Sequence, residues 1–344
     1  MRTYPLIRSL LFRLKPEVAH NLTLQVLRVA GGISLINSLL SRTYQASSKP
    51  VEVFGIRFAN PIGLAAGYDK DGLGWKGLAC LGFSHVEIGT VTPRPQAGNP
   101  KPRLFRLPEQ KALINRMGFP GRGAEFVRQQ ISIQRPKNLV LGVNIGKNKD
   151  TPLETAEQDY LFLLDYFAGY ADYLTINVSS PNTVGLRQLQ ERDALDRLLK
   201  SVTEERARIL SNGTRTIPLL VKLSPDLTDS QLDDALDVIT RNRIDGVIAT
   251  NTTLAREGVR SPLANEAGGL SGVPIFELSL AMVGKISRRT SGNLPVIGVG
   301  GIINATGVLK MMDAGAKLVQ IYTGLLYEGP TLIKRILLDL LKLP

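Results

Sequence analysis

The chain is poor in the residues that build several common kinds of site. Its 344 residues include one cysteine, Cys80, and two histidines, His20 and His85. A single cysteine excludes an internal disulfide framework and a zinc site built from thiolates. With only two distant histidines and no clustered carboxylates, we expect no metal site and no Ser-His-acid triad. His85 begins an apolar run and Cys80 lies among apolar residues, so we expect both to be structural.

Aromatic residues and long apolar runs are also scarce. Aromatics make up 6% of the chain, so stacking platforms for bases are not evident and nucleic acid is not the expected partner. The apolar runs are shorter than the roughly 18 residues that a membrane span requires, and no cleavable signal peptide is indicated. Hydrophobic residues nevertheless form 43% of the chain, which is typical of a globular protein with a large core.

The positive charge is concentrated at the N-terminus. Residues 1–50 contain seven basic residues and one acidic residue, Glu17. Their net charge of +6 is half of the total net charge of +12. Leucines between residues 6 and 14 recur at helical spacing, and Pro16 opens a second helix. An apolar stripe flanked by arginines is typical of a helix in a membrane interface, but a helical pair packed on the main domain explains it equally well. We divide the chain into an amphipathic helical segment, residues 1–45, and a main domain, residues 46–344.

Short apolar runs alternate with stretches of helical periodicity from residue 60 onward, which predicts βα repeats and a parallel sheet. We count eight runs, the number that closes a (β/α)8 TIM barrel. Polar or glycine residues follow every run, whereas a doubly wound sheet gathers its ligands at one switch point. No G-x-G-x-x-G motif opens an early helix, which argues against a Rossmann domain. The runs cover residues 61–67, 85–90, 139–145, 173–178, 218–223, 246–250, 294–299 and 318–322.

Two connections are too long to be simple loops. Residues 91–138 and 251–293 should contain additional substructure, the first as an ordered excursion over the barrel mouth. The segment SSPNTVGLRQLQ after the fourth run has the composition of a mobile lid, and a passive surface loop is the alternative.

Several residues at the run ends suggest chemistry. The glycines of residues 298–302 and the YTG segment at 322–324 occupy the loops that bind phosphate in many barrels, although a glycine-rich turn alone is a weak signal. Lys70 follows the first run and Lys222 lies inside the fifth. Such a lysine suits a Schiff base, a fixed charge beside an anionic cofactor atom, or a structural ion pair, and the residues alone leave all three open.

Five asparagines fall at strand ends or just beyond them. Each one alone is explained as a turn or cap residue, but together they suit a planar ring with alternating C=O and N–H groups. Ser180 is the one hydroxyl in this set that we consider as a base, although neither a histidine nor an acid is adjacent to it. The asparagines are Asn115, Asn144, Asn177, Asn182 and Asn251.

Taken in order, these motifs resemble the dihydroorotate dehydrogenase family along nearly the whole chain. The combination is far more specific than any single motif. The matching strings are NPIGLAAGYDKDG (60–72), IGTVTPRPQAGNPKPRLFRLPE (88–109), INRMGF (114–119), GVNIGKNK (142–149), INVSSPNT (176–183), VKLSPDL (221–227), ATNTT (249–253), GGLSG (268–272), IGVGGI (297–302) and QIYTG (320–324).

The resemblance implies an FMN flavoprotein that oxidises (S)-dihydroorotate to orotate in pyrimidine (UMP) biosynthesis. Ser180 matches the family's catalytic base, and Lys222 would lie beside the electron-rich part of the flavin. The implied substrate residues are Lys70, Asn115, Arg116, Met117, Gly118, Phe119, Asn177, Asn182, Asn251 and Thr252. The implied FMN residues are Ala66, Gly67, Tyr68, Asp69, Lys70, Thr90, Asn144, Asn177, Lys222, Thr250, Gly272, Gly301, Tyr322 and Thr323.

A serine at position 180 is similar to the membrane-associated, quinone-using class of this family. In that class two N-terminal helices form the mouth of a quinone tunnel, and His20, Arg106 and Tyr322 would line it here, with plain packing as the alternative for His20. The resemblance thus implies a monomer bound peripherally to an anionic surface, the cytoplasmic side of the inner membrane. One departure is the PGRG segment after INRMGF, where Pro120 removes a backbone donor and should alter the loop.

Two other classes of protein have to be weighed. One is another flavin barrel, acting on free dihydropyrimidines or reducing uridines in RNA, and Ser180 and the helical N-terminus argue against it. The other is a membrane-surface binding protein that retains the barrel as a scaffold, since a fold alone does not prove activity. The presence of Ser180, Lys70 and Lys222 argues against that alternative.

Overall fold

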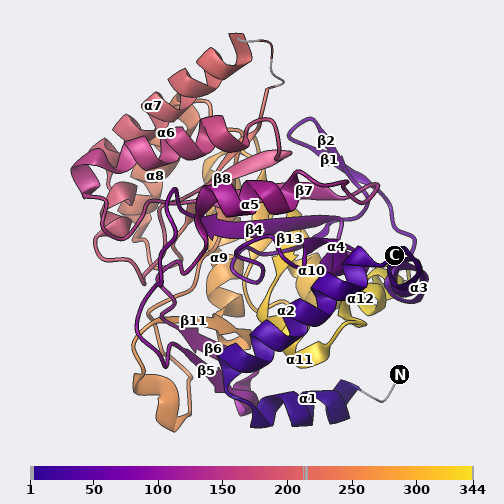
Figure 1. The fold of residues 1–344 in the computed structure, drawn as a ribbon. Coiled ribbons are helices and arrows are strands. Elements are labelled where there is room, and N and C mark those ends of the chain that lie inside the picture. Colours follow the sequence, from indigo (N-terminus) through magenta and orange to yellow (C-terminus); the bar gives the residue numbers. More distant parts are fainter. Residues whose placement is uncertain (1–3, 212, 214–215, 343–344) are drawn as a thin grey trace.

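The centre of the molecule is a closed barrel of parallel strands. The computed structural model describes residues 4–211, 213 and 216–342, and within them the barrel order is β10-β12-β13-β3-β4-β7-β8-β9 (Figure 1). Each strand coincides with one of the eight apolar runs, so the predicted TIM barrel is confirmed. The strands are β3 (Ile62–Leu64), β4 (His85–Val91), β7 (Val140–Ile145), β8 (Tyr173–Asn177), β9 (Leu219–Leu223), β10 (Gly246–Ala249), β12 (Val296–Val299) and β13 (Ala316–Ile321).

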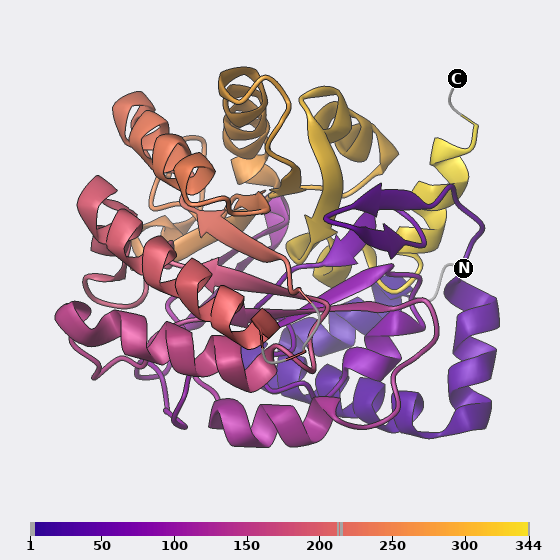
Figure 2. The same cartoon turned by 90° about the horizontal axis from the view of Figure 1, so that it is seen from above.

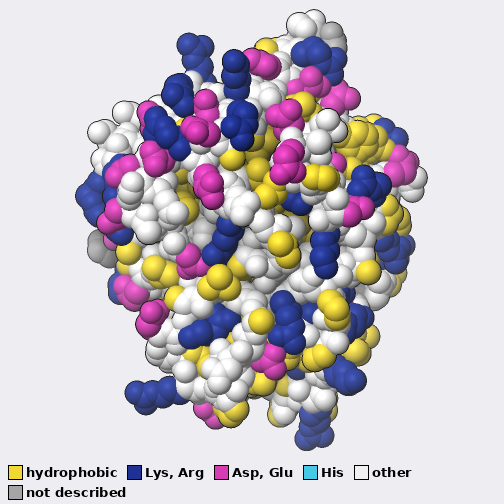
Figure 3. All heavy atoms as spheres, turned by 90° about the vertical axis from the view of Figure 1, so that its left-hand side faces the viewer, with side chains coloured by type: hydrophobic (Ala, Val, Ile, Leu, Met, Phe, Trp, Pro, Cys, Tyr) yellow, Lys and Arg dark blue, Asp and Glu magenta, His cyan; other side chains and the backbone are white. Residues whose placement is uncertain are grey.

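Amphipathic helices surround the strands, and Figure 2 shows them following one another around the barrel. In α7, for example, Leu195, Leu198, Leu199 and Val202 recur at helical spacing and are buried against the barrel. The outer faces carry mixed charge, and acidic and basic side chains alternate on the side where α6, α7 and α8 lie (Figure 3). The helices are α4 (Trp75–Ala79), α5 (Gly123–Ile131), α6 (Ala156–Phe167), α7 (Arg192–Ser211), α8 (Asp229–Arg241), α9 (Phe276–Arg289), α10 (Ala305–Asp313), α11 (Thr323–Glu328) and α12 (Leu332–Leu340).

A β-hairpin closes the barrel at the end where the strands begin. Its strands, β1 (Val51–Val53) and β2 (Ile56–Phe58), bring Phe58 into a buried cluster with Tyr173 and Leu220. His85 lies in this layer, edge-on to Phe58 with ring centroids 5.3 Å apart, and burial lowers its pKa to about 3. The imidazole occupies the space that a Cβ at Gly63 would need. The predicted structural role of His85 is therefore confirmed, and Cys80 is buried as expected.

Both long connections contain the expected additional substructure, and it forms one sheet. Strands β5 (Leu104–Leu107) and β6 (Ala112–Asn115) come from the first connection, and β11 (Gly269–Gly272) comes from the second. They pair antiparallel in the order β11-β6-β5. The loop with Pro120 is held by two backbone hydrogen bonds between Gln96 and Gly121, so this segment is ordered although proline lacks a donor.

Three helices precede the barrel. The predicted pair corresponds to α1 (Tyr4–Arg13) and α2 (Pro16–Gly32), while α3 (Ser34–Tyr44) was not expected. α2 packs so tightly on α4 that a Cβ at Gly77 would lie 2.1 Å from the carbonyl oxygen of Leu27. α1 is attached to α11, where Tyr4 Oη donates to the carbonyl of Leu326 (2.6 Å) and Arg8 donates to that of Tyr327 (2.7 Å).

No single helix among the described residues is both long and apolar enough to cross a bilayer. α2 and α3 have sufficient length and apolar composition only as a pair, and the chain bends by 107° between them.

Candidate active site

A cavity opens at the carboxyl ends of the barrel strands, under the β11-β6-β5 sheet. It has a volume of about 1200 Å³ when its open mouth is included. Residues from the strand ends, from this sheet and from α2 line it together. Those predicted as site residues are His20, Ala66, Gly67, Lys70, Thr90, Asn115, Met117, Gly118, Phe119, Asn177, Ser180, Asn182, Lys222, Thr250, Asn251, Thr252, Gly272, Gly301, Tyr322 and Thr323.

A layer of hydrogen-bonded amides forms part of the cavity floor. Asn177 Nδ2 donates to Thr90 Oγ1 (2.9 Å) and to Asn144 Oδ1 (3.0 Å), and Thr90 Oγ1 donates to the same Asn144 oxygen (2.5 Å). Asn144 is fully buried and lies outside the cavity lining. The structure therefore places Asn144 behind Asn177, where it fixes the direction of the Asn177 amide.

Glu87, which the sequence analysis overlooked, is the centre of the next layer. Its carboxylate accepts hydrogen bonds from Asn144 Nδ2 (2.9 Å), Tyr173 Oη (3.1 Å) and Gln320 Nε2 (2.9 Å). A fully buried carboxylate is costly unless its oxygens are satisfied, as they are here. The signal in the sequence was an acid within the otherwise apolar run HVEIGT.

Lys222 brings a cation into the cavity from β9. Its side chain is buried, and no hydrogen bond or ion pair of its ammonium is found among the described residues. Burial lowers the pKa of Lys222, and the charge of Glu87 acts in the opposite direction. Gln320 Oε1 is likewise buried without a hydrogen-bond partner among these residues, and Gln320 also lines the cavity. Of the three explanations for Lys222, the structural ion pair is the least consistent with this geometry.

Lys70 also lines the cavity, from the loop after β3. Its ammonium donates to the carbonyl oxygen of Gly67 at 2.6 Å. Burial lowers the pKa of Lys70 to about 8. This ammonium is therefore still charged at neutral pH, but within reach of deprotonation in mildly alkaline solution.

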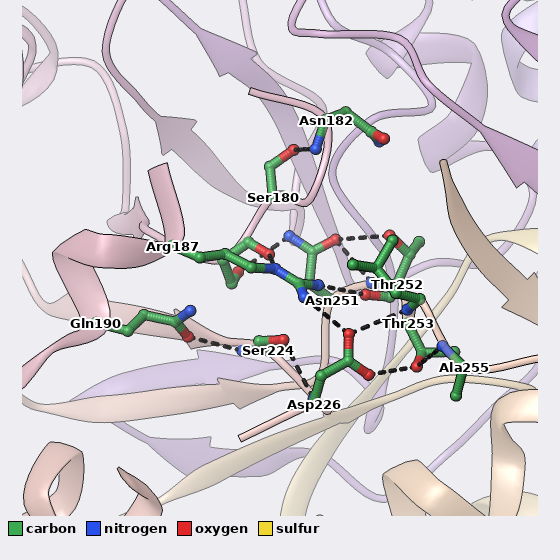
Figure 4. A network of polar contacts seen from close by, with 12 residues as sticks. Ser180, Asn182, Arg187, Gln190, Ser224, Asp226, Asn251, Thr252, Thr253 and Ala255 are labelled. Atoms are coloured by element: carbon green, nitrogen blue, oxygen red, sulfur yellow. Dashed lines mark hydrogen bonds and ion pairs between the residues drawn. The ribbon is translucent and has the colours of Figure 1, made fainter. Parts of the chain in front are cut away.

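Ser180 lies in the loop that follows β8, with its side chain buried at the cavity (Figure 4). Its hydroxyl oxygen accepts a hydrogen bond from the backbone N–H of Asn182 (3.2 Å). Asn182 Nδ2 in turn donates to Asn115 Oδ1 (3.1 Å), which connects this loop to β6. Asn251 Nδ2 donates to the hydroxyl of Ser179, the residue before Ser180 (3.0 Å). Four of the five predicted asparagines thus line the same cavity as Ser180.

The glycine-rich turn after β12 and the start of α11 form another wall of the cavity. Gly301 and Thr323 both line it, as does Ser271 from β11. The hydroxyls of Ser271 and Thr323 lie 2.9 Å apart. Ser271 was not singled out from the sequence, although it lies within the GGLSG motif.

Aromatic rings and α2 form the remaining wall. The rings of His20 and Tyr68 meet edge to face with centroids 5.0 Å apart, and those of Tyr68 and Tyr322 with centroids 5.7 Å apart. Burial lowers the pKa of His20 to about 3, and the nearby charge of Lys70 contributes to the shift. Glu17 of α2 also lines the cavity, although it was not among the predicted site residues.

Several predicted site residues do not line the cavity. Arg106 donates to the carbonyls of Phe12 (3.2 Å) and Leu14 (3.0 Å), so it holds the turn between α1 and α2. Its place in a quinone tunnel with His20 and Tyr322 stays a prediction.

Arg116, Asp69 and Tyr68 also have other partners. The guanidinium of Arg116 is paired with Glu266 at 2.6 Å, its backbone N–H donates to the carbonyl of Arg103 (2.9 Å), and its own carbonyl accepts from Asn99 Nδ2 (3.1 Å). The Asp69 carboxylate accepts from the N–H groups of Leu73 (2.8 Å) and Gly74 (2.7 Å) before α4, and burial raises its pKa to about 6. Tyr68 is buried and does not line the cavity, although its ring contacts those of His20 and Tyr322, which do.

The comparison with protein families agrees with this geometry. The family model described as dihydroorotate dehydrogenase matches residues 49–343. The chain belongs to the dihydroorotate dehydrogenase family.

Curated relatives and solved structures extend this result. A "Dihydroorotate dehydrogenase (quinone)" of Paraburkholderia phymatum is 48% identical over 331 residues, which cover 96% of this chain and 95% of that one. One of Pseudomonas putida is 49% identical over 332 residues, with 96% of each chain covered. The crystal structure of ligand-free DHODH from Eimeria tenella superposes with a TM-score of 0.86 at 37% identity, covering 95% of this chain and 94% of that one. The complex of the Eimeria tenella protein with ferulenol gives a TM-score of 0.82 at 36% identity, covering 95% and 91%.

Proposed function

We propose that this family member oxidises (S)-dihydroorotate to orotate with FMN as hydride acceptor and a membrane quinone as final oxidant, in the biosynthesis of pyrimidines. The observation that supports this most strongly is a single cavity that unites a buried serine hydroxyl, four asparagine amides and two lysine ammonium groups. The quinone as oxidant is supported by the names of the relatives from Paraburkholderia phymatum and Pseudomonas putida.

The cavity suits FMN in the groups that it leaves unpaired. Lys222 and the unpartnered Gln320 Oε1 offer a cation and an acceptor to a polar ring, and the glycine turn with Thr323 would hold the phosphate. When bound, FMN supplies a two-electron acceptor for hydride. Lys222 would stabilise negative charge on the reduced ring. The proposed FMN residues at the cavity are Ala66, Gly67, Lys70, Thr90, Asn177, Lys222, Thr250, Gly272, Gly301, Tyr322 and Thr323, with Tyr68, Asp69 and Asn144 supporting them from behind.

The substrate would lie between the amides and Lys70. Dihydroorotate carries one carboxylate, which suits the Lys70 ammonium, and ring amide groups, which suit side chains that both donate and accept. We assign Asn115, Asn177, Asn182, Asn251 and Thr252 to the ring, with the backbone of residues 116–119 closing the site. Arg116 would act by positioning the residues that follow it, since its side chain is paired with Glu266 and its backbone N–H and carbonyl are both hydrogen-bonded within the protein.

Ser180 would act as the base. Forming the C5=C6 double bond of orotate requires a proton to leave C5 and a hydride to leave C6. Ser180 Oγ accepts a hydrogen bond from the N–H of Asn182, which fixes its position and stabilises negative charge on the oxygen. As Ser180 Oγ takes the proton from C5, its own hydroxyl proton would pass to solvent.

We further propose that residues 1–45 form a membrane-associating segment on the barrel of residues 46–344. Exposed apolar side chains on α1, α2 and α3 support contact with lipid, and basic residues support contact with an anionic surface. The aromatic wall, where α2 reaches the cavity, would admit the quinone head group. The protein would then bind as a monomer to the cytoplasmic side of the inner membrane without crossing it.

The first test is the visible spectrum of the purified protein, recorded before and after anaerobic addition of dihydroorotate. We expect a yellow protein whose flavin band bleaches, and quinone should restore the band. A yellow protein that does not bleach would retain the flavin but exclude this substrate, which favours another flavin barrel. A colourless protein that cannot be reconstituted with FMN would overturn the proposal.

A further inference from the structure

Arg187 lies outside the cavity lining and contacts three loops at the carboxyl ends of the strands, two of which line the cavity. It belongs to the short helix η3 (Leu186–Gln190), which follows the Ser180 loop. Its Nε donates to the carbonyl oxygen of Ser179 (3.2 Å), one terminal nitrogen donates to that of Thr252 (3.2 Å), and the other pairs with Asp226 (2.8 Å). These partners follow β8, β10 and β9 respectively, so one guanidinium connects three consecutive strand ends (Figure 4).

Asp226 completes the connection from the loop after β9. Besides Arg187, its carboxylate accepts hydrogen bonds from the hydroxyl of Thr253 and from the backbone N–H of Leu254 (3.0 Å). Arg187, Asp226 and the segment 252–254 therefore form a closed ring of polar contacts. The side chains of Arg187 and Asp226 are 24% and 23% exposed, so the pair is shielded without being fully desolvated.

This ring reaches the reacting group through Ser179. The carbonyl of Ser179 is held by Arg187 and its hydroxyl by Asn251, so the residue before Ser180 is fixed on both sides. Asn251 itself follows β10, next to Thr252, whose carbonyl Arg187 also holds. Ser180 and Asn251 are thus linked through a side chain that does not itself line the cavity.

The chemistry of arginine matters for this arrangement. A planar guanidinium presents several N–H donors in fixed directions, and it can serve two carbonyls and one carboxylate at once. A lysine ammonium could keep the attraction to Asp226, but it could not donate to the two carbonyls and the carboxylate in these fixed directions. Gln190, one turn further along η3, accepts from the N–H of Ser224 (3.0 Å) and provides a second tie to the β9 loop.

We propose that Arg187, held by Asp226, is a positioning residue that keeps Ser180 in the geometry for proton removal. The inference rests on the proposed function. Displacing a base by a fraction of an ångström costs rate while binding contacts survive, because proton transfer is more sensitive to geometry than binding is. The loss should therefore appear in the rate of flavin reduction, with little change in the affinity for orotate.

The test compares variants of the full-length FMN-loaded protein in the two halves of the reaction. For Arg187→Ala we expect anaerobic flavin reduction by dihydroorotate to slow about 10-fold or more. Arg187→Lys and Asp226→Asn should give smaller losses of about 3-fold. Reoxidation by a short-tailed quinone should stay unchanged, because that half-reaction does not use Ser180. The matched control is Arg192→Ala, whose guanidinium pairs with Asp234 and Asp237 on the protein surface.

A double variant separates positioning from general destabilisation. If Arg187 acts through Ser180, then Ser180→Ala combined with Arg187→Ala will reduce its flavin no more slowly than Ser180→Ala alone. Additive losses, equal losses in both half-reactions, or a loss in the Arg192→Ala control would overturn the positioning role. So would unchanged reduction in Arg187→Ala. A wild-type flavin that dihydroorotate does not bleach would instead overturn the proposed function, so the two failures are distinguishable.

Discussion

The N-terminal helices and the barrel helices are both amphipathic, but their apolar faces have different surroundings. Barrel helices such as α7 and α8 turn their apolar stripes inward, where leucines and valines are buried against the strands. α1–α3 and their connections carry 12 of the 21 large apolar side chains that are exposed in the described residues, within about an eighth of the chain. The barrel provides the partner for its own helices. The apolar stripe of the N-terminal helices is not covered by any other part of the described structure. This difference between the two regions supports a lipid partner for the N-terminal helices.

The two regions meet at the cavity, through α2. Glu17 on this helix pairs with Arg103 (2.7 Å), and Arg103 also donates to the carbonyls of Ala97 (2.6 Å) and Asn99 (3.0 Å). Asn99 Nδ2 donates to the carbonyl oxygen of Asn182 (3.0 Å), which lies in the same loop as Ser180. α2 is thus connected to the loop that carries Ser180, whereas α1 is attached to α11 and to Arg106 of β5. The following experiments separate the chemistry of the barrel from the contribution of these helices.

The largest effect is expected from Ser180→Ala, which removes the proposed base from the barrel. Flavin reduction by dihydroorotate should slow by about 100-fold or more, the usual scale for losing a general base. Bound FMN and reoxidation by quinone should be unchanged, because neither involves this hydroxyl. Stopped-flow absorbance of the flavin band measures both steps. Equal reduction rates in the variant and the wild type would remove Ser180 from the mechanism.

Deleting residues 1–14 should produce the next largest effect, on the other half of the reaction. The deletion removes α1 but keeps α2, whose Leu24 is buried in the main core and whose Leu27 lies against Gly77. We expect turnover with a long-tailed quinone in vesicles to fall about 10-fold, because attachment to the membrane weakens. Flavin reduction and turnover with a short-tailed quinone should remain at the wild-type level.

The comparison between the two quinones is the control in that experiment. Equal losses with both would mean that α1 supports the fold of the cavity. No loss with either would mean that its exposed apolar face has no part in reaching the quinone.

The comparison of the two regions also explains what the sequence could predict. The eight strands were predictable because each run is predominantly apolar and ends in a polar or glycine residue at the same edge. The site followed from this, since parallel strands bring those ends together. The sheet formed by β5, β6 and β11 was not predictable, because β11 follows β6 by about 150 residues and pairing at such a distance leaves no local pattern.

Three further details depended on the tertiary structure. Glu87 was missed because its partners come from other strands, as with Tyr173 and Gln320. The third helix, α3, lacks a side-chain N-cap and any fully buried residue, so neither capping nor burial marks it. Arg106 was expected in a quinone tunnel, which stays a prediction, and its hydrogen bonds to the carbonyls of Phe12 and Leu14 could not be foreseen from local sequence.

A smaller effect should follow from the ionisation of Lys70. Burial lowers its pKa to about 8, so this ammonium loses its charge as the pH rises through that value. The affinity for the orotate carboxylate should therefore be constant below about pH 7 and fall above about pH 8, up to about tenfold per pH unit. Titration of the flavin absorbance with orotate measures this without any proton transfer by Ser180. In Lys70→Arg the charge persists, and a similar decline in that variant would assign the effect to another group.

The smallest effect is expected at His20, where α2 reaches the cavity. Burial lowers its pKa to about 3, so the imidazole is neutral throughout pH 5–8 and cannot supply a titrating charge to the quinone step. His20→Phe preserves an aromatic ring that can pack edge-on against Tyr68. We expect its rate of reoxidation by quinone to change by less than about 3-fold, with the same dependence on pH as the wild type. Flavin reduction serves as the internal control, since Ser180 lies on a different loop. A large loss in reoxidation alone, or a pH dependence that vanishes in His20→Phe, would show that the helices contribute a reacting group. An unchanged rate and pH dependence of reoxidation would mean that the helices line the cavity and provide access for quinone, while the reacting groups come from the barrel.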